Sequence, residues 1–306
     1  MNNIKKNLYY ALKPFIPRWL QIVVRRRLVA SQRLTCTDIW PIDEKAGKPP
    51  DGWSGWPDNK RFALVLTHDV ETAAGQDKCR ELMEIEIDAG FRSSFNFVPE
   101  RYEVSSALRR YIVSSGFEVG VHDLNHDGKL YRSEKVFTER AARINHYLKE
   151  WNSKGFRSGS MDRNLEWLHE LDIEYDSSTF DTDPFEPWFE GVGTIFPFIV
   201  MNDRCGRYVE LPYTIPQDFT VFVLMGEKNI DIWKKKLDWI AENGGMALLT
   251  THPDYMNLNG KQGLEEYPVE YYREFLDYID SEYNGRYWHV LPSEMSRFWS
   301  DTLCRV

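Results

Sequence analysis

The sequence has few cysteines, no long apolar run and no excess of positive charge. Its cysteines have no paired spacing, so we interpret them as free thiols of a reducing compartment, with one disulfide as the alternative. They are Cys36, Cys79, Cys205 and Cys304. No uninterrupted apolar stretch reaches the length of a signal peptide or of a membrane-spanning helix, about 20 residues. The net charge of −9 disfavours a nucleic-acid partner.

The composition that remains is that of a globular protein, with 42% hydrophobic and 28% charged residues. At 306 residues the chain is long enough for a sizeable core, either as about two domains or as one α/β barrel. We find no internal repeat and no low-complexity tract. Aromatic residues make up 14% of the chain; most should lie in the core, and some could stack on sugar rings.

Residues 1–30 contain several basic side chains and no acidic one. One interpretation is a basic anchor that touches an anionic membrane from its inner, cytoplasmic face. The other is a helical arm packed on the domain, with apolar residues at near-helical spacing toward the core: Leu8, Leu12, Ile16 and Leu20. We favour the packed arm, because Pro14 and Pro17 would break a long helix lying on a membrane. Both interpretations predict a cytoplasmic protein.

Apolar strand patterns alternate with helical ones after a Pro-, Gly- and Trp-rich lead-in at residues 31–60. Strands are expected at 62–67, 91–98, 117–122, 155–157, 173–175, 207–212, 219–224, 246–251 and 287–291. Helices are expected at 76–89, 104–115, 133–151, after Asp162, at 230–243 and 268–280, and after Ser293. Repeated β-then-α units indicate an α/β fold of mostly parallel strands. We therefore divide the chain into an extension, 1–60, and a main domain, 61–306.

Two acidic residues follow the first of these strands. Side chains alternate along a strand, so Asp69 and Glu71, two residues apart, should leave its C-terminal end on the same side. In α/β sheets and barrels, chemistry collects at this end of the strands. A single acidic residue at a strand end is more often a helix N-cap.

Histidines follow two other expected strands. His122 and His126 are four residues apart, and one helical turn after the strand would direct both imidazoles toward one point. His252 ends the strand at 246–251. Alone, such a pair is usually part of a helix surface. Together with a carboxylate, the two histidines form a three-ligand set with coordination positions left open for water and substrate, which favours a hydrolytic metal centre.

These motifs, in this order, resemble those of the polysaccharide deacetylases, carbohydrate esterase family 4. The likeness rests on the segments 67–71, 122–126, 156–158, 175–178 and 249–253. It covers about residues 60–295 and implies a distorted, incomplete (β/α) barrel that hydrolyses N- or O-acetyl groups of sugars.

The sequence departs from the family pattern at its first motif. Val70 stands where the family usually has a metal-binding aspartate, and valine cannot bind a metal. Some relatives carry Asp-Val-Asp instead, and in that pattern Glu71 would be the ligand. The prolines that usually follow the third-motif arginine are replaced by Ser158, Gly159 and Ser160.

The resemblance implies a role for each motif residue. A divalent metal, with zinc favoured by the nitrogen and oxygen donors, would be held by Glu71, His122 and His126. Asp69 would be the general base, and Arg157 would keep it ionised and oriented. His252 would protonate the leaving group, with Asp176 a candidate for orienting it. The alternative for Arg157 and Asp176 is a structural ion pair or turn.

We therefore predict a metal-dependent hydrolase of carbon–nitrogen bonds that removes acetyl groups from a carbohydrate, either a bacterial surface polysaccharide or a lipid-linked sugar. One alternative, suggested by Val70, is a sugar-binding relative that has lost activity. Another is a metal-dependent amidase of a small non-sugar substrate, because one fold can serve several reactions.

Overall fold

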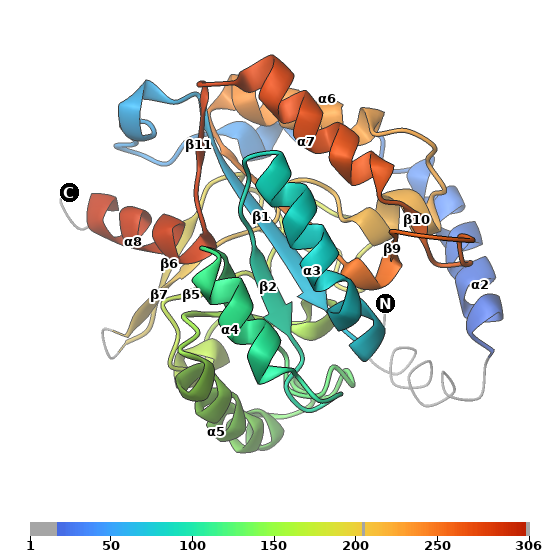
Figure 1. Cartoon of the computed structure of the whole chain (residues 1–306). Coiled ribbons are helices and arrows are strands. Elements are labelled where there is room, and N and C mark those ends of the chain that lie inside the picture. Colours follow the sequence, from blue (N-terminus) through green and yellow to red (C-terminus); the bar gives the residue numbers. More distant parts are fainter. Residues whose placement is uncertain (1–16, 204–205, 304–306) are drawn as a thin grey trace.

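A computed structural model describes residues 17–203 and 206–303 (Figure 1). Its strands are β1 (Phe62–Val70), β2 (Ser94–Phe97), β3 (Glu118–His122), β4 (Gly155–Arg157), β5 (Tyr175–Asp176), β6 (Phe198–Met201), β7 (Arg207–Glu210), β8 (Met246–Thr251), β9 (Met256–Asn257), β10 (Tyr267–Pro268) and β11 (Tyr287–His289). Its α-helices are α2 (Arg18–Arg33), α3 (Ala73–Asp88), α4 (Ser106–Ser114), α5 (Glu134–Trp151), α6 (Asp231–Asn243), α7 (Glu270–Tyr283) and α8 (Pro292–Leu303).

One curved sheet of mostly parallel strands organises the described residues. β1 pairs with β8 along one edge and with β11 and then β2 along the other. From β2 the sheet continues through β3, β4, β5 and β7 to β6, which is antiparallel to β7. Single bridges, such as Ile215 to Leu249, connect the far side back to β8 in place of a full strand. The predicted fold, a distorted and incomplete (β/α) barrel, is confirmed.

The strongest sequence patterns form a central strand and a helix that packs on the sheet. All nine residues of β1 are buried, as expected for a strand covered on both faces. Ser133 caps α5 by accepting a hydrogen bond from the backbone N–H of Val136, and α5 buries an apolar stripe that includes Phe137 and Ile144. Parallel strands joined by such helices bring the C-terminal ends of β1, β3, β4 and β8 to the same end of the barrel.

Two expected elements differ in the structure. The apolar run Phe219–Leu224, expected as a strand, is a buried π-helix, because a short apolar run does not distinguish a buried strand from a buried helix. The helix expected after Asp162 is only a 3₁₀ turn, Trp167–Glu170. The antiparallel strand β6 was not predicted.

The N-terminal part of the described chain packs on the barrel. Ile22 and Val29 of α2 are buried in a cluster with Phe219 and Val223, so residues 17–33 pack on the barrel. Leu20, which was expected to face the core, is instead 37% exposed, because Ile22 and Val29 lie on the side of the helix that meets the barrel. Leu8, Leu12 and Ile16 lie outside the described residues. The lead-in is held at the other end of the molecule, where Trp53 packs on Trp299 of α8 at a ring distance of 4.8 Å.

Two further expectations concern thiols and membrane spans. Cys36 and Cys79 are buried free thiols, whereas Cys205 and Cys304 lie outside the described residues. Among residues 17–203 and 206–303, no helix combines the length and apolar character needed to cross a membrane.

Candidate metal centre

Asp69 is oriented so that one of its carboxylate oxygens faces the centre of the barrel end. Its Oδ1 accepts hydrogen bonds from the side-chain amide of Asn96 at 2.9 Å and from Nη1 of Arg157 at 3.1 Å. Its Oδ2 lies 3.9 Å from Nε2 of His122. Val70, the next residue, is fully buried in the core. The alternation expected along this strand is therefore present: Asp69 faces the site and Val70 faces away from it.

His122 presents an unpaired ring nitrogen to the same space. Its Nδ1 lies 3.0 Å from the carbonyl oxygen of Arg157, so Nδ1 carries the proton and donates it. Nε2 is then a lone-pair nitrogen, and it is buried without a hydrogen-bond partner among the described residues. Leaving a buried polar atom unpaired costs free energy unless a ligand uses it. This tautomer and orientation are those of a histidine that binds a metal.

His126 reaches the site through a tight turn and not through the helical turn expected from its spacing. Asp123 and His126 both adopt left-handed backbone angles, with φ of 54° and 51°. Nε2 of His126 lies 3.3 Å from Oε1 of Glu71. The expected convergence of the two imidazoles is present, but its cause is this turn.

Glu71, His122 and His126 offer three ligand atoms that all lie within 4.8 Å of one another. Two imidazole nitrogens and a carboxylate form a set that zinc accepts, with a further position left for water or substrate. Burial would raise the pKa of Glu71, but the nearby His126 lowers it to about 2, so the carboxylate is ionised at neutral pH. The donor chemistry and the unpaired nitrogen of His122 fit a divalent metal ion.

Arg157 makes the contact with Asp69 that the sequence predicted. Its side chain is fully buried, and besides Asp69 it donates from Nη1 to Oγ1 of Thr67 at 2.9 Å and from Nε to the carbonyl of Ser177. Burial opposes the charge of Asp69, but the Arg157 guanidinium holds the pKa of this carboxyl below its ordinary range. Asp69 is therefore an ionised carboxylate.

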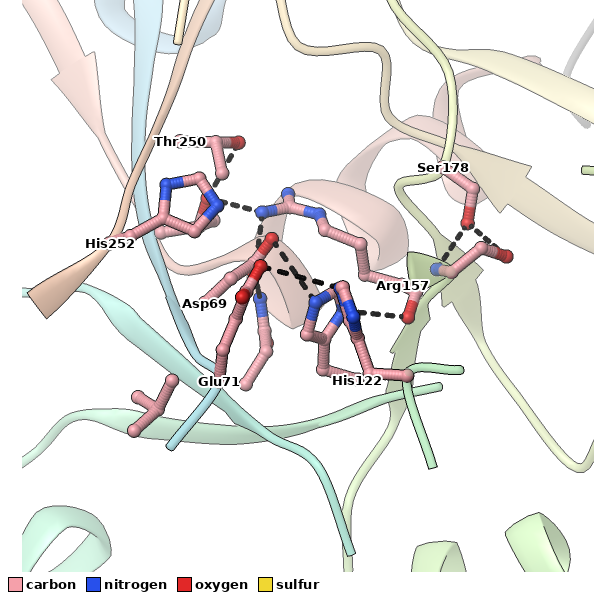
Figure 2. A network of polar contacts seen from close by, with 12 residues as sticks. Asp69, Glu71, His122, Arg157, Ser178, Thr250 and His252 are labelled. Atoms are coloured by element: carbon pink, nitrogen blue, oxygen red, sulfur yellow. Dashed lines mark hydrogen bonds and ion pairs between the residues drawn. The ribbon is translucent and has the colours of Figure 1, made fainter. Parts of the chain in front are cut away.

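His252 is oriented by Asp218, and not by Asp176 as the sequence suggested. Nδ1 of His252 lies 2.7 Å from Oδ1 of Asp218, and the backbone N–H of His252 donates to Oδ2 of the same carboxylate. Burial would lower the pKa of His252, but Asp218 raises it to about 10. Figure 2 shows Asp69 and Glu71 between His252 and His122.

Asp176 has a different environment. It lies at the end of β5, where its carboxylate accepts hydrogen bonds from the hydroxyl and the backbone N–H of Ser178. Asp176 thus closes a turn, which was the alternative considered for this residue. Asp218 was missed because it directly precedes the run mistaken for a strand. Asn96 was missed because nothing in its sequence surroundings distinguishes it from other polar residues in strands.

In Asp218→Asn, activity is expected to fall at a lower pH than in the wild-type protein as the pH is raised. If His252 is the proton donor expected from the sequence, activity should decline as pH rises through its pKa, because only the protonated imidazole can donate. Removing the negative charge of Asp218 lowers that pKa, and a neighbouring opposite charge is typically worth about 1 to 3 pH units. A pH profile of kcat measures the shift. Asp176→Asn is the matched control and should leave the midpoint in place; a shift there with none in Asp218→Asn would contradict the assignment.

Gly159→Ala is expected to weaken metal binding by about 10- to 100-fold, the loss typical when a residue that supports a ligand is changed. A Cβ at this position would lie 2.6 Å from Oδ2 of Asp123 and 2.9 Å from Cδ2 of His126. The His126 turn must therefore move. Zinc titration monitored by calorimetry tests this, with the neighbouring Ser160→Ala as control. Equal affinity in the two variants would show that the turn does not position His126.

Comparison with known proteins identifies the fold. No family model and no curated protein matches the sequence. The fold is similar to that of a protein from Mycobacterium smegmatis described as a polysaccharide deacetylase, with a TM-score of 0.62 and 18% identity over 83% of this chain and 96% of that one. A protein from Pseudomonas aeruginosa PAO1 with the same description gives a TM-score of 0.60 at 17% identity, over 80% and 93% of the two chains.

This chain has the polysaccharide deacetylase fold. The same fold also includes a Puue allantoinase, which matches with a TM-score of 0.62 and 16% identity over 86% of this chain and 98% of that one. The polysaccharide deacetylase fold is therefore shared by enzymes named for different substrates, and it does not by itself identify the reaction of this chain.

Proposed function

We propose that this chain is a metal-dependent hydrolase that removes N- or O-acetyl groups from a carbohydrate. One observation carries the proposal: three kinds of group lie together at one end of the barrel. They are the Asp69 carboxylate, with Oδ2 toward His122, the ligand set of Glu71, His122 and His126, and His252 paired with Asp218. These are the groups that hydrolysis of an amide or ester needs: a base, an electrophilic centre and an acid.

The ligand set would hold the divalent metal, and zinc is the ion that its donors favour. Such an ion, when bound, supplies Lewis acidity that makes water more acidic and polarises a carbonyl. Glu71 comes from the end of β1, and His122 and His126 come from β3 and the turn after it. β2 lies between these two strands in the sheet, and His252 follows β8, which pairs with the other edge of β1.

Asp69 acts as the general base in this proposal. Arg157 and Asn96 hold its Oδ1, so Oδ2 is the atom that accepts the proton of the attacking water. His252, protonated at neutral pH and held by Asp218, lies near both carboxylates and donates a proton to the leaving amine or alkoxide. Asp69 acts in its ionised form and His252 in its protonated form, as a base and an acid in one site require.

A metal-dependent amidase of a small non-sugar substrate is the second candidate, and its support is the similarity in fold to the allantoinase. The sugar-binding relative without activity is less well supported. Val70, which suggested it, is buried in the core, and Glu71 supplies the carboxylate at the site.

The deciding experiment compares substrates on the purified, zinc-loaded protein. Acetate release is measured from N-acetylated and O-acetylated oligosaccharides, and hydrolysis from allantoin and small formamides. We expect acetate release from a sugar that disappears with a chelator and returns with zinc. Hydrolysis of allantoin alone would establish the amidase, and zinc binding with no hydrolysis of any substrate would support the sugar-binding protein.

A further inference from the structure

The outer face of α2 is apolar, although α2 lies at the surface of the molecule. Four large apolar side chains of this helix are exposed, and we refer to them as the outer face: Trp19 (57%), Leu20 (37%), Val24 (48%) and Leu28 (61%). Leu20, Val24 and Leu28 follow one another at intervals of four residues and therefore form one stripe. A surface helix normally directs its polar residues to solvent. Figure 1 shows α2 at the edge of the molecule, beside β9 and β10.

The arginines of α2, by contrast, contact the protein body. Nε of Arg18 donates to Glu265 at 2.8 Å, and Nε of Arg26 donates to the carbonyl oxygen of Val223 at 2.8 Å. The guanidinium of Arg25 lies 5.0 Å from the centre of the Phe219 ring. These cations are therefore used to hold the helix on the barrel, with the apolar stripe directed outward. This arrangement differs from the basic anchor considered from the sequence.

The inner side of α2, opposite the outer face, lies close to the metal centre. Phe219, which Arg25 covers, packs on Tyr255 at a ring distance of 4.6 Å. The hydroxyl of Tyr255 lies 3.5 Å from Oε2 of Glu71. Only two aromatic side chains therefore separate α2 from the proposed metal ligands. A partner on the outer face would therefore lie across this one helix from the site.

A groove of about 550 Å³ runs along one side of α2. Its lining includes the cations Arg26, Arg27 and Lys228, apolar Val29 and Leu264, and one acid, Glu266. Leu264 is itself 48% exposed and extends the apolar surface next to the helix. Apolar side chains next to cations suit a lipid, whose acyl chains and anionic headgroup need both.

We propose that the outer face of α2 is buried in the boundary between headgroups and acyl chains of a lipid bilayer. Tryptophan and arginine are favoured at that depth, since each has an apolar body and a polar end. Two exposed cations beside the helix, Arg27 of α2 and Lys228, also match anionic headgroups.

The bilayer contact is independent of the reaction. Its consequence for substrate rests on the proposed function: a site held at a bilayer would act on a sugar attached to a lipid, in preference to a free polysaccharide. In this scheme residues 1–60 carry the attachment and residues 61–306 the chemistry.

Co-sedimentation of the full-length protein with vesicles of phosphatidylglycerol and phosphatidylcholine tests the contact without any substrate. We expect the wild-type protein to pellet, and Trp19→Ser/Val24→Ser/Leu28→Ser to bind at least about tenfold more weakly, because interfacial binding scales with buried apolar area. The matched control is Ile87→Ser/Val113→Ser/Met201→Ser, three similarly exposed apolar residues elsewhere, which should bind as wild type. High salt should weaken binding less than the outer-face substitutions do.

Several outcomes would overturn the bilayer contact. One is a wild-type protein that does not pellet; another is an outer-face variant that pellets like the control. If high salt abolished vesicle binding while the outer-face variant bound as well as wild type, the contact would be a basic anchor and not the apolar outer face. A concentration-dependent dimer that the variant loses, with no vesicle binding, would identify a second copy as the partner. Both triple variants should hydrolyse a soluble acetylated sugar equally fast. This assay therefore distinguishes a failure of the proposed reaction from a failure of the bilayer contact.

Discussion

Asp69→Asn is expected to lower kcat by about 10²- to 10⁴-fold while the protein keeps its metal, because this is the usual contribution of a general base. The asparagine amide oxygen can still accept the hydrogen bonds that Asn96 and Arg157 donate to Oδ1. The amide nitrogen then replaces Oδ2, the atom toward His122, and it cannot accept a proton. Steady-state kinetics and metal analysis on the same preparation measure the two properties.

Glu71→Gln is the counterpart that distinguishes the two carboxylates. Its side chain belongs to the ligand set, so we expect metal content to fall together with activity. If Asp69→Asn lost the metal and Glu71→Gln retained it, the roles assigned to the two residues would be reversed. Retention of full activity in Asp69→Asn would exclude Asp69 as the base.

His122→Ala and His126→Ala are each expected to abolish metal-dependent activity and to weaken zinc binding by more than about 100-fold, beyond the loss seen for residues that only support a ligand. His122 offers a buried ring nitrogen without a partner, and His126 lies against Glu71. Zinc content after dialysis and the calorimetric Kd measure the effect.

His146→Ala is the control for the two ligand variants. This histidine is 69% exposed on α5 and pairs with Glu150, so its removal should change neither metal content nor turnover. Circular dichroism should show that all three variants fold. Full zinc occupancy in His126→Ala would remove His126 from the ligand set.

The C-terminal ends of the strands could be predicted from the sequence, because the patterns that mark a strand lie within a few consecutive residues. An apolar run such as Phe62–Leu66 predicts a buried strand, and alternation then places Asp69 and Glu71 on one side. The same logic located His122 and His252. The path to His126 was not accessible, since four-residue spacing is shared by a helical turn and by the left-handed turn that the chain adopts.

The sequence by itself determined the α/β class, the strand ends that carry chemistry and, through the resemblance, the barrel. Only the tertiary structure decided which acid holds His252, because Asp218 is 34 residues away in the chain and a hydrogen bond depends on proximity in space. It also decided which side of α2 meets the barrel. A basic, apolar helix can turn either its arginines or its apolar stripe outward. The acceptors available on the body, Glu265 and the carbonyl of Val223, draw the arginines inward.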